Sequence, residues 1–89
     1  MNEQVPLTLI EWRDSAQPTP QWQYLSDYAP SSAITCVSVG YLVHDGDDVK
    51  ALAQSLGCGD SEGSVQASGI LHIPACSITR QVQLAELAD

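Results

Sequence analysis

The strongest structural signal in this chain is the alternation of apolar residues between residues 33 and 43. Successive side chains of a β-strand point to opposite faces of the sheet, so each alternating set marks one face. One face is predicted to carry Val37, Val39, Tyr41 and Val43, and the other Ile34, Cys36 and Leu42. Because both sets are apolar, we expect a central strand that is buried on both sides.

A hairpin turn is predicted directly after this strand, in the acidic run at residues 44–48. The run contains Asp45-Gly46, and Asp-Gly favours a type I′ turn, in which both central residues adopt a positive φ. Residues 49–56 are therefore expected to return as the paired strand.

Three further strands are predicted from the same alternation. They are expected at residues 5–12, with a twist or bulge near the end, at 65–73 and at 78–84. Pro74 ends the strand before it, and residues 75–77 have room for one 3₁₀ turn before the last strand.

The longest connection, residues 14–32, separates the first two predicted strands. It holds three of the five prolines, which exclude a long helix because each removes a backbone donor and restricts the preceding residue. Its large apolar side chains are Trp22, Tyr24, Leu25 and Tyr28. Polar linkers seldom carry so much aromatic surface, so we expect an ordered loop folded onto the body, with one helical turn within residues 21–27.

The size of the chain limits how many domains it can form. Eighty-nine residues with 44% apolar content predict a single folded domain over residues 1–89. The glycine-rich residues 57–64 are expected to be a flexible loop, and the tail at 85–89 is expected to fray. So small a domain has little stability in reserve, and self-association adds buried area, so we expect a homo-oligomer.

Five short strands, a long first loop and a one-turn break before the last strand predict an all-β fold, a small and strongly bent barrel. This order and residues 68–78 resemble the SH3-like and Sm-like small barrels. The resemblance implies a five-stranded barrel with a 3₁₀ turn before its closing strand. Sm-like proteins bind RNA with basic and aromatic loop residues, whereas the corresponding loops here are acidic. Residues 36–45 and 73–78 also look like parts of small uncharacterised bacteriophage and prophage proteins.

Charge limits the partners of this chain. The formal net charge is −8, and the only basic side chains are Arg13, Lys50 and Arg80. Binding bare nucleic acid needs clustered Lys and Arg that neutralise phosphates, so this partner is excluded. A protein with a basic surface is the favoured partner.

Carboxylates gather in two of the predicted loops. They are Asp45, Asp47, Asp48, Asp60 and Glu62. Calcium loops need alternating oxygen ligands over about a dozen residues and a closing glutamate, a pattern that this sequence lacks. The carboxylates are interpreted either as solvated turns or, if both hairpin ends lie on one side of the barrel, as a negative rim for a basic partner.

Neither an enzyme nor a metal site is predicted. Cys36, Cys58 and Cys76 are odd in number and form no C-x-x-C pair, so neither disulfides nor zinc are indicated, and a reducing cytoplasm fits best. A cysteine nucleophile needs a histidine and positive surroundings that lower the thiol pKa, and this chain is acidic. No cofactor is implied.

The sequence offers no signal peptide and no apolar run of ~18–20 residues that would span a membrane.

Trp22, Tyr24 and Tyr28 have two interpretations. They form a lid over an open end of the barrel, or they anchor a contact surface, since Trp and Tyr are enriched where binding energy concentrates. Both interpretations stay open from the sequence.

The leading functional hypothesis is a non-enzymatic, cytoplasmic phage or prophage accessory protein. It would bind and inhibit a host defence protein through its acidic surface and loop aromatics. One alternative is an oligomer that sequesters a small nucleotide, which would need a local pocket with Arg13, Lys50 or Arg80 as anion contacts. Another is a structural or assembly component of a virion.

Overall fold

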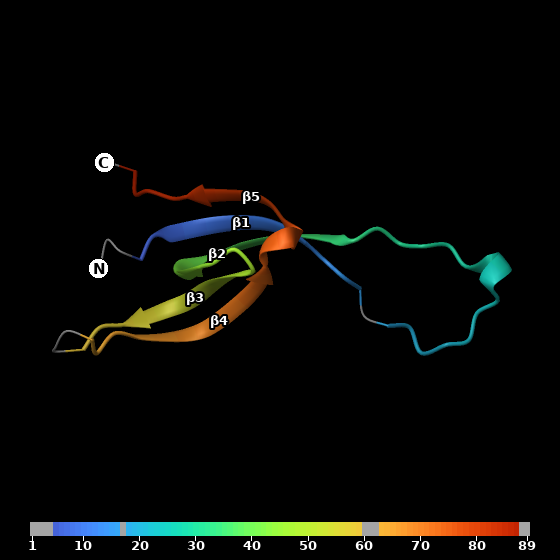
Figure 1. The fold of residues 1–89 in the computed structure, drawn as a ribbon, viewed down its shortest axis with the longest axis horizontal. Coiled ribbons are helices and arrows are strands. Elements are labelled where there is room, and N and C mark those ends of the chain that lie inside the picture. The colour runs from blue at the N-terminus through green and yellow to red at the C-terminus, as the bar shows by residue number, and fades with distance from the viewer. Residues whose placement is uncertain (1–4, 17, 60–62, 88–89) are drawn as a thin grey trace.

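The chain folds as one antiparallel β-sheet from which a long arm projects (Figure 1). The computed structural model describes residues 5–16, 18–59 and 63–87. Within them the elements are, with η for a 3₁₀ turn, β1 (Leu7–Asp14), η1 (Leu25–Asp27), β2 (Ile34–Asp45), β3 (Val49–Gly57), β4 (Gln66–Pro74), η2 (Ala75–Ser77) and β5 (Ile78–Gln83). All strands predicted from alternation are confirmed, as is the 3₁₀ turn before the last one.

The order of strands across the sheet is β4-β3-β2-β1-β5, and each neighbouring pair is antiparallel. In the described part of the chain β4 and β5 are edge strands that no ladder joins, so the sheet is not closed. The all-β prediction is confirmed, while the closed barrel stays a prediction. No helix among the described residues is long and apolar enough to cross a membrane.

The sheet curls around a small core. Ile10 of β1, Leu52 of β3 and Ile73 of β4 form one buried cluster, although β2 lies between β1 and β3. Paired residues of neighbouring strands point to the same face. We call the face that carries this cluster the inner face; Trp12, Leu42 and Ile78 pack against the cluster.

The opposite positions of the same strands form the outer face. Its apolar side chains are Leu7, Leu9, Val37, Val39, Tyr41, Ile70 and Val82. β2 is the middle strand, as predicted, but the prediction that it is buried on both sides is wrong. Val37 is 59% exposed and Val39 53% exposed, because no second layer among the described residues covers this face.

Gly40 lies at the point where β2 approaches β3 most closely. A Cβ atom at this position would meet the backbone oxygen of Ala53 at 2.7 Å and the Cβ of Leu52 at 3.1 Å. Gly40 is also the one fully buried residue of β2, all of which is described. Only glycine fits this contact, which lets β2 bend over the core.

The β2–β3 hairpin forms as predicted, but its turn differs. The Gly46 N–H donates to the Val49 carbonyl at 3.1 Å. Positive φ values occur in the described chain only at Gly63 and Gly69, so the predicted type I′ turn is wrong. Residues 46–48 make a three-residue connection, and longer loops do not need two consecutive left-handed residues. Gly69 in β4 has a φ of +65°, which favours glycine.

Candidate interaction site

The segment between β1 and β2 projects away from the sheet as a two-limbed arm, residues 15–33, with η1 at its tip (Figure 1). Every described residue of this arm is exposed. Trp22 is 100% exposed, Leu25 89% and Tyr24 81%. The prediction that this segment folds onto the body is therefore wrong, and so is the interpretation of its aromatics as a lid. The predicted helical turn is present as the 3₁₀ turn η1.

Proline and the local backbone explain why the arm is extended. Pro18 and Pro20 stiffen one limb and Pro30 the other, and each biases the residue before it to extended conformations. Tyr24 and Tyr28, which flank η1, are extended, with ψ values of 135° and 131°.

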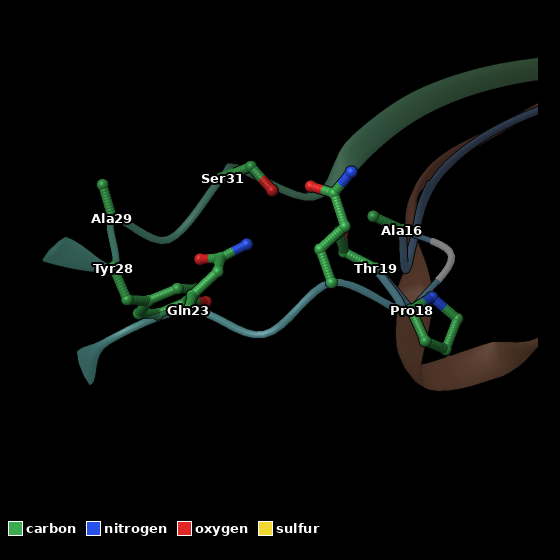
Figure 2. A pocket seen from close by; sticks show the side chains of 8 residues that line it. Ala16, Pro18, Thr19, Gln23, Tyr28, Ala29 and Ser31 are labelled. Carbon is green, nitrogen blue, oxygen red and sulfur yellow. The ribbon is translucent and has the colours of Figure 1, made fainter.

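The two limbs of the arm enclose an open cavity of 530 Å³. Figure 2 shows Gln23 and Tyr28 on the same side of this space as Ala29 and Ser31, with Pro18 nearer the sheet. The lining residues are Ala16, Pro18, Thr19, Gln21, Gln23, Tyr28, Ala29 and Ser31. This lining carries amide and hydroxyl groups and no charged side chain among the described residues, so it offers a neutral polar surface.

The β2–β3 turn is acidic and lies near the base of the arm. Asp45, Asp47 and Asp48 are all exposed there. The Asp48 carbonyl accepts a hydrogen bond from the Ala75 N–H at 2.9 Å, which holds the turn beside η2. η2 also contacts β1, so the turn lies near the base of the arm, although the arm and the turn follow opposite ends of β2.

The second acidic run lies in the connection that follows β3, whereas the β2–β3 turn precedes β3. Asp60 and Glu62 of this run lie outside the described residues, so a negative rim that combines both loops stays a prediction.

The Lys50 ammonium forms an ion pair with Asp45. Its hydrogen bond holds the pKa of the Asp45 carboxyl below the ordinary value of 3.8, with a smaller contribution from Gln81. A carboxyl whose pKa is lowered in the folded state stabilises the fold above its ordinary pKa, and that stabilisation is lost as the pH falls through the folded-state pKa.

We therefore expect Asp45→Asn to lower the free energy of unfolding at neutral pH, by no more than the ~0.2–1 kcal/mol typical of exposed ion pairs. The difference from the parent protein should shrink as the pH falls below 3.8. Urea unfolding over a pH series measures it. Most of the effect should disappear in a Lys50→Ala background, and a difference that persists there would rule out the ion pair as its source.

The three basic residues do not converge on one site. Lys50 pairs with Asp45 on the inner face, whereas Arg80 Nη1 lies 3.2 Å from Glu11 Oε1 on the outer face. Within the described ranges, Arg13 is the one basic residue without an ion pair. The anion contacts that a nucleotide pocket would need are therefore distributed over both faces of the sheet.

The cysteines and histidines also stay apart. Cys36 is half-buried, and Cys58 and Cys76 are exposed. All three are free thiols. No group of three His, Cys, Asp or Glu side chains within the described residues could hold a metal ion.

The outer face is the one surface that the sequence analysis missed. The signal for it was the pair of apolar faces over residues 33–43, because the described part of the chain has no further strand or helix to cover the second face. A sheet face with several exposed apolar side chains is unusual for a monomer and marks an interaction surface.

The arm aromatics provide a direct stability test. Replacing Trp22 and Tyr24 together by alanine is expected to change the free energy of unfolding by less than ~0.5 kcal/mol, because neither side chain packs on the body. Trp12→Ala should cost ~3–5 kcal/mol, because this side chain packs against the core and its Nε1 donates to Ser38 Oγ at 3.0 Å. Denaturant unfolding followed by circular dichroism compares them. A large loss from the arm variant would mean that the arm packs on the sheet.

Comparisons with known protein families, with curated proteins and with solved structures find no match to this chain. The functional argument therefore depends on the geometry described above.

Proposed function

We propose that this protein acts by binding other proteins and not by catalysis, with the tip of the arm as a contact surface. The observation that carries the proposal is the exposure of Trp22, Tyr24 and Leu25 around η1, remote from the core. Leaving large apolar side chains in water has a cost that burial against a partner removes. Trp and Tyr are also the residues that most often dominate binding energy in protein interfaces.

The acidic turn supplies a second contact surface, for a cationic target. Asp47 and Asp48 are exposed and have no ion pair among the described residues, and the whole chain carries a net charge of −8. Such a field attracts basic surfaces over a range of about a Debye length and raises association rates. The turn lies beside η2, which contacts β1 near the base of the arm, and this allows both surfaces to serve one assembly.

The proposed biological setting is that of a cytoplasmic phage or prophage accessory protein that inhibits a host defence protein. It rests on the resemblance of residues 36–45 and 73–78 to small phage proteins. The strand order and the position of η2 are compatible with the SH3-like or Sm-like barrel that we propose for the fold. A virion assembly component is the second candidate, favoured by the projecting arm and the two edge strands. Nothing in the geometry favours nucleotide sequestration.

Site-specific photo-crosslinking tests the proposed contact surface. A photoreactive phenylalanine analogue is placed at Trp22, and a control is placed at Gln66, an exposed position at the start of β4. Adducts with protein are expected from position 22 and not from position 66. Mass spectrometry identifies the partner, and purified components then give the affinity.

Two variants separate the roles of the two surfaces. Trp22→Ala with Tyr24→Ala should weaken binding at least about tenfold, as expected for the loss of hot-spot residues. Asp47→Asn with Asp48→Asn should lower the association rate and its salt dependence while leaving dissociation nearly unchanged. Crosslinking that is no stronger at position 22 than at position 66 would contradict the proposal.

A further inference from the structure

Two uncovered apolar surfaces occur on this one chain, the arm tip and the outer face. On the outer face Leu9 pairs with Val39 on one side and with Val82 on the other, so these three side chains form a row across three strands. A second row runs from Leu7 through Tyr41 and Ala53 to Ile70. Both rows extend over neighbouring strands, which makes the outer face a continuous apolar surface.

Both surfaces carry little negative charge. Among the described residues, Asp27 is the one acidic residue of the arm, and Glu11 is the one acidic strand residue that points to the outer face. Glu11 is paired with Arg80 there, and Arg13 is the second arginine on the same face. Although each copy has a net charge of −8, the arm of one copy therefore meets less local like-charge repulsion at the outer face of another copy than at its acidic turn.

The remaining charges on the two surfaces are complementary. Asp27 has no ion pair within the described residues, and neither has Arg13. Glu11 is the cross-strand partner of Val37, and Arg13 lies two residues further along β1. Two residues of a strand span ~7 Å, so Arg13 lies about that far from the Val37 position along the strand direction. A ligand with aromatic side chains and one carboxylate therefore fits the part of the outer face that adjoins the base of the arm.

We propose that the arm tip of one copy docks on the outer face of a second copy. Trp22 and Tyr24 cover Val37 and Val39, and Asp27 pairs with Arg13. The contact is reciprocal, because a two-fold symmetric pair forms it twice. This proposal rests on the proposed function in one respect, namely that the arm tip is a contact surface. It adds that the protein bound by the arm tip is a second copy of this chain. The acidic turn takes no part in it and stays available for a cationic target.

Charge exchange tests the pairing of Asp27 with Arg13. Sedimentation velocity of the full chain over a concentration series is expected to show a reversible dimer. Asp27→Arg and Arg13→Asp should each weaken the dimer about tenfold or more, and the double variant should restore it. Asp47→Arg makes the same change in net charge as Asp27→Arg and should not weaken the dimer. A parent protein that stays monomeric, or a double variant as weak as the single ones, would overturn the proposal.

Complementation between variants tests which surfaces meet. The arm variant carries Trp22→Ser and Tyr24→Ser, and the face variant carries Val37→Ser and Val39→Ser. Each alone should be monomeric at concentrations where the parent dimerises, and an equimolar mixture should recover a dimer, since one intact arm then meets one intact face. Control substitutions at exposed apolar positions elsewhere, Val65→Ser and Leu87→Ser, should leave the parent dimer unchanged.

The pattern of recovery excludes the other arrangements. If arm docked on arm, the face variant alone would still dimerise, and if outer face docked on outer face, the arm variant alone would still dimerise. Circular dichroism of each variant confirms that it is folded, and all substituted side chains are exposed. The crosslinker at position 22 separates the two proposals: adducts with another protein and none with a second copy would refute the dimer and leave the proposed function standing. Absence of all adducts would refute both.

Discussion

Ile10→Ala is expected to remove most of the stability of this protein. Ile10 is fully buried in β1 and belongs to a cluster that holds only two further buried large side chains, Leu52 and Ile73, among the described residues. Shortening a buried isoleucine to alanine loses transfer free energy and leaves a cavity, at a cost of ~2–5 kcal/mol. Whole domains are stable by only ~5–15 kcal/mol, and small ones lie near the lower limit.

Equilibrium urea unfolding, followed by far-ultraviolet circular dichroism, measures this loss. Ile34→Ala is the matched control, because it deletes the same atoms from a side chain that is 52% exposed. It is expected to change the free energy of unfolding by no more than ~0.5 kcal/mol. Equal losses at the two positions would mean that the cluster around Ile10 is not the core of the fold.

Gly40→Ala is expected to destabilise the fold by steric overlap between two strands. The new methyl group would meet the Ala53 carbonyl oxygen at 2.7 Å, and this atom belongs to the backbone of the adjacent strand. β2 and β3 would have to move apart at the bend, and overpacking of this kind costs ~1–3 kcal/mol. The change should lower the denaturant midpoint.

Gly57→Ala is the control for this substitution. At Gly57, which ends β3, the nearest atom to an added Cβ is the Gln66 carbonyl oxygen at 4.0 Å, an ordinary contact. The stability of the Gly57→Ala variant should equal that of the parent protein or be slightly higher, because alanine reduces the conformational freedom of the unfolded chain. If Gly40→Ala were as harmless as Gly57→Ala, the close approach of β2 and β3 would be disproved.

Only part of the candidate site could be predicted from the sequence. Trp22, Tyr24 and Tyr28 stood out because such residues are rare in a proline-bearing loop, but composition alone could not distinguish a lid from an exposed arm. Asp47 and Asp48 lie in the exposed turn that the sequence predicts, whereas Asp45, which is also exposed, is the last residue of β2. The pairing of Lys50 with Asp45 and of Arg80 with Glu11 depends on strand register, which no local pattern specifies.

What the sequence determined by itself is the set of strands. Alternation of apolar residues has a range of only a few residues, and it placed the strands, the hairpin after Asp45 and the 3₁₀ turn after Pro74. The tertiary structure alone decided which apolar face is covered. Burial depends on whether another segment reaches a surface: the inner face curls around Ile10, Leu52 and Ile73, whereas the outer face and the arm meet nothing within the described chain. The inner and outer faces share the same local pattern, yet one is buried and the other is exposed. The reason is that packing depends on the whole chain, whereas periodicity is a property of a single segment.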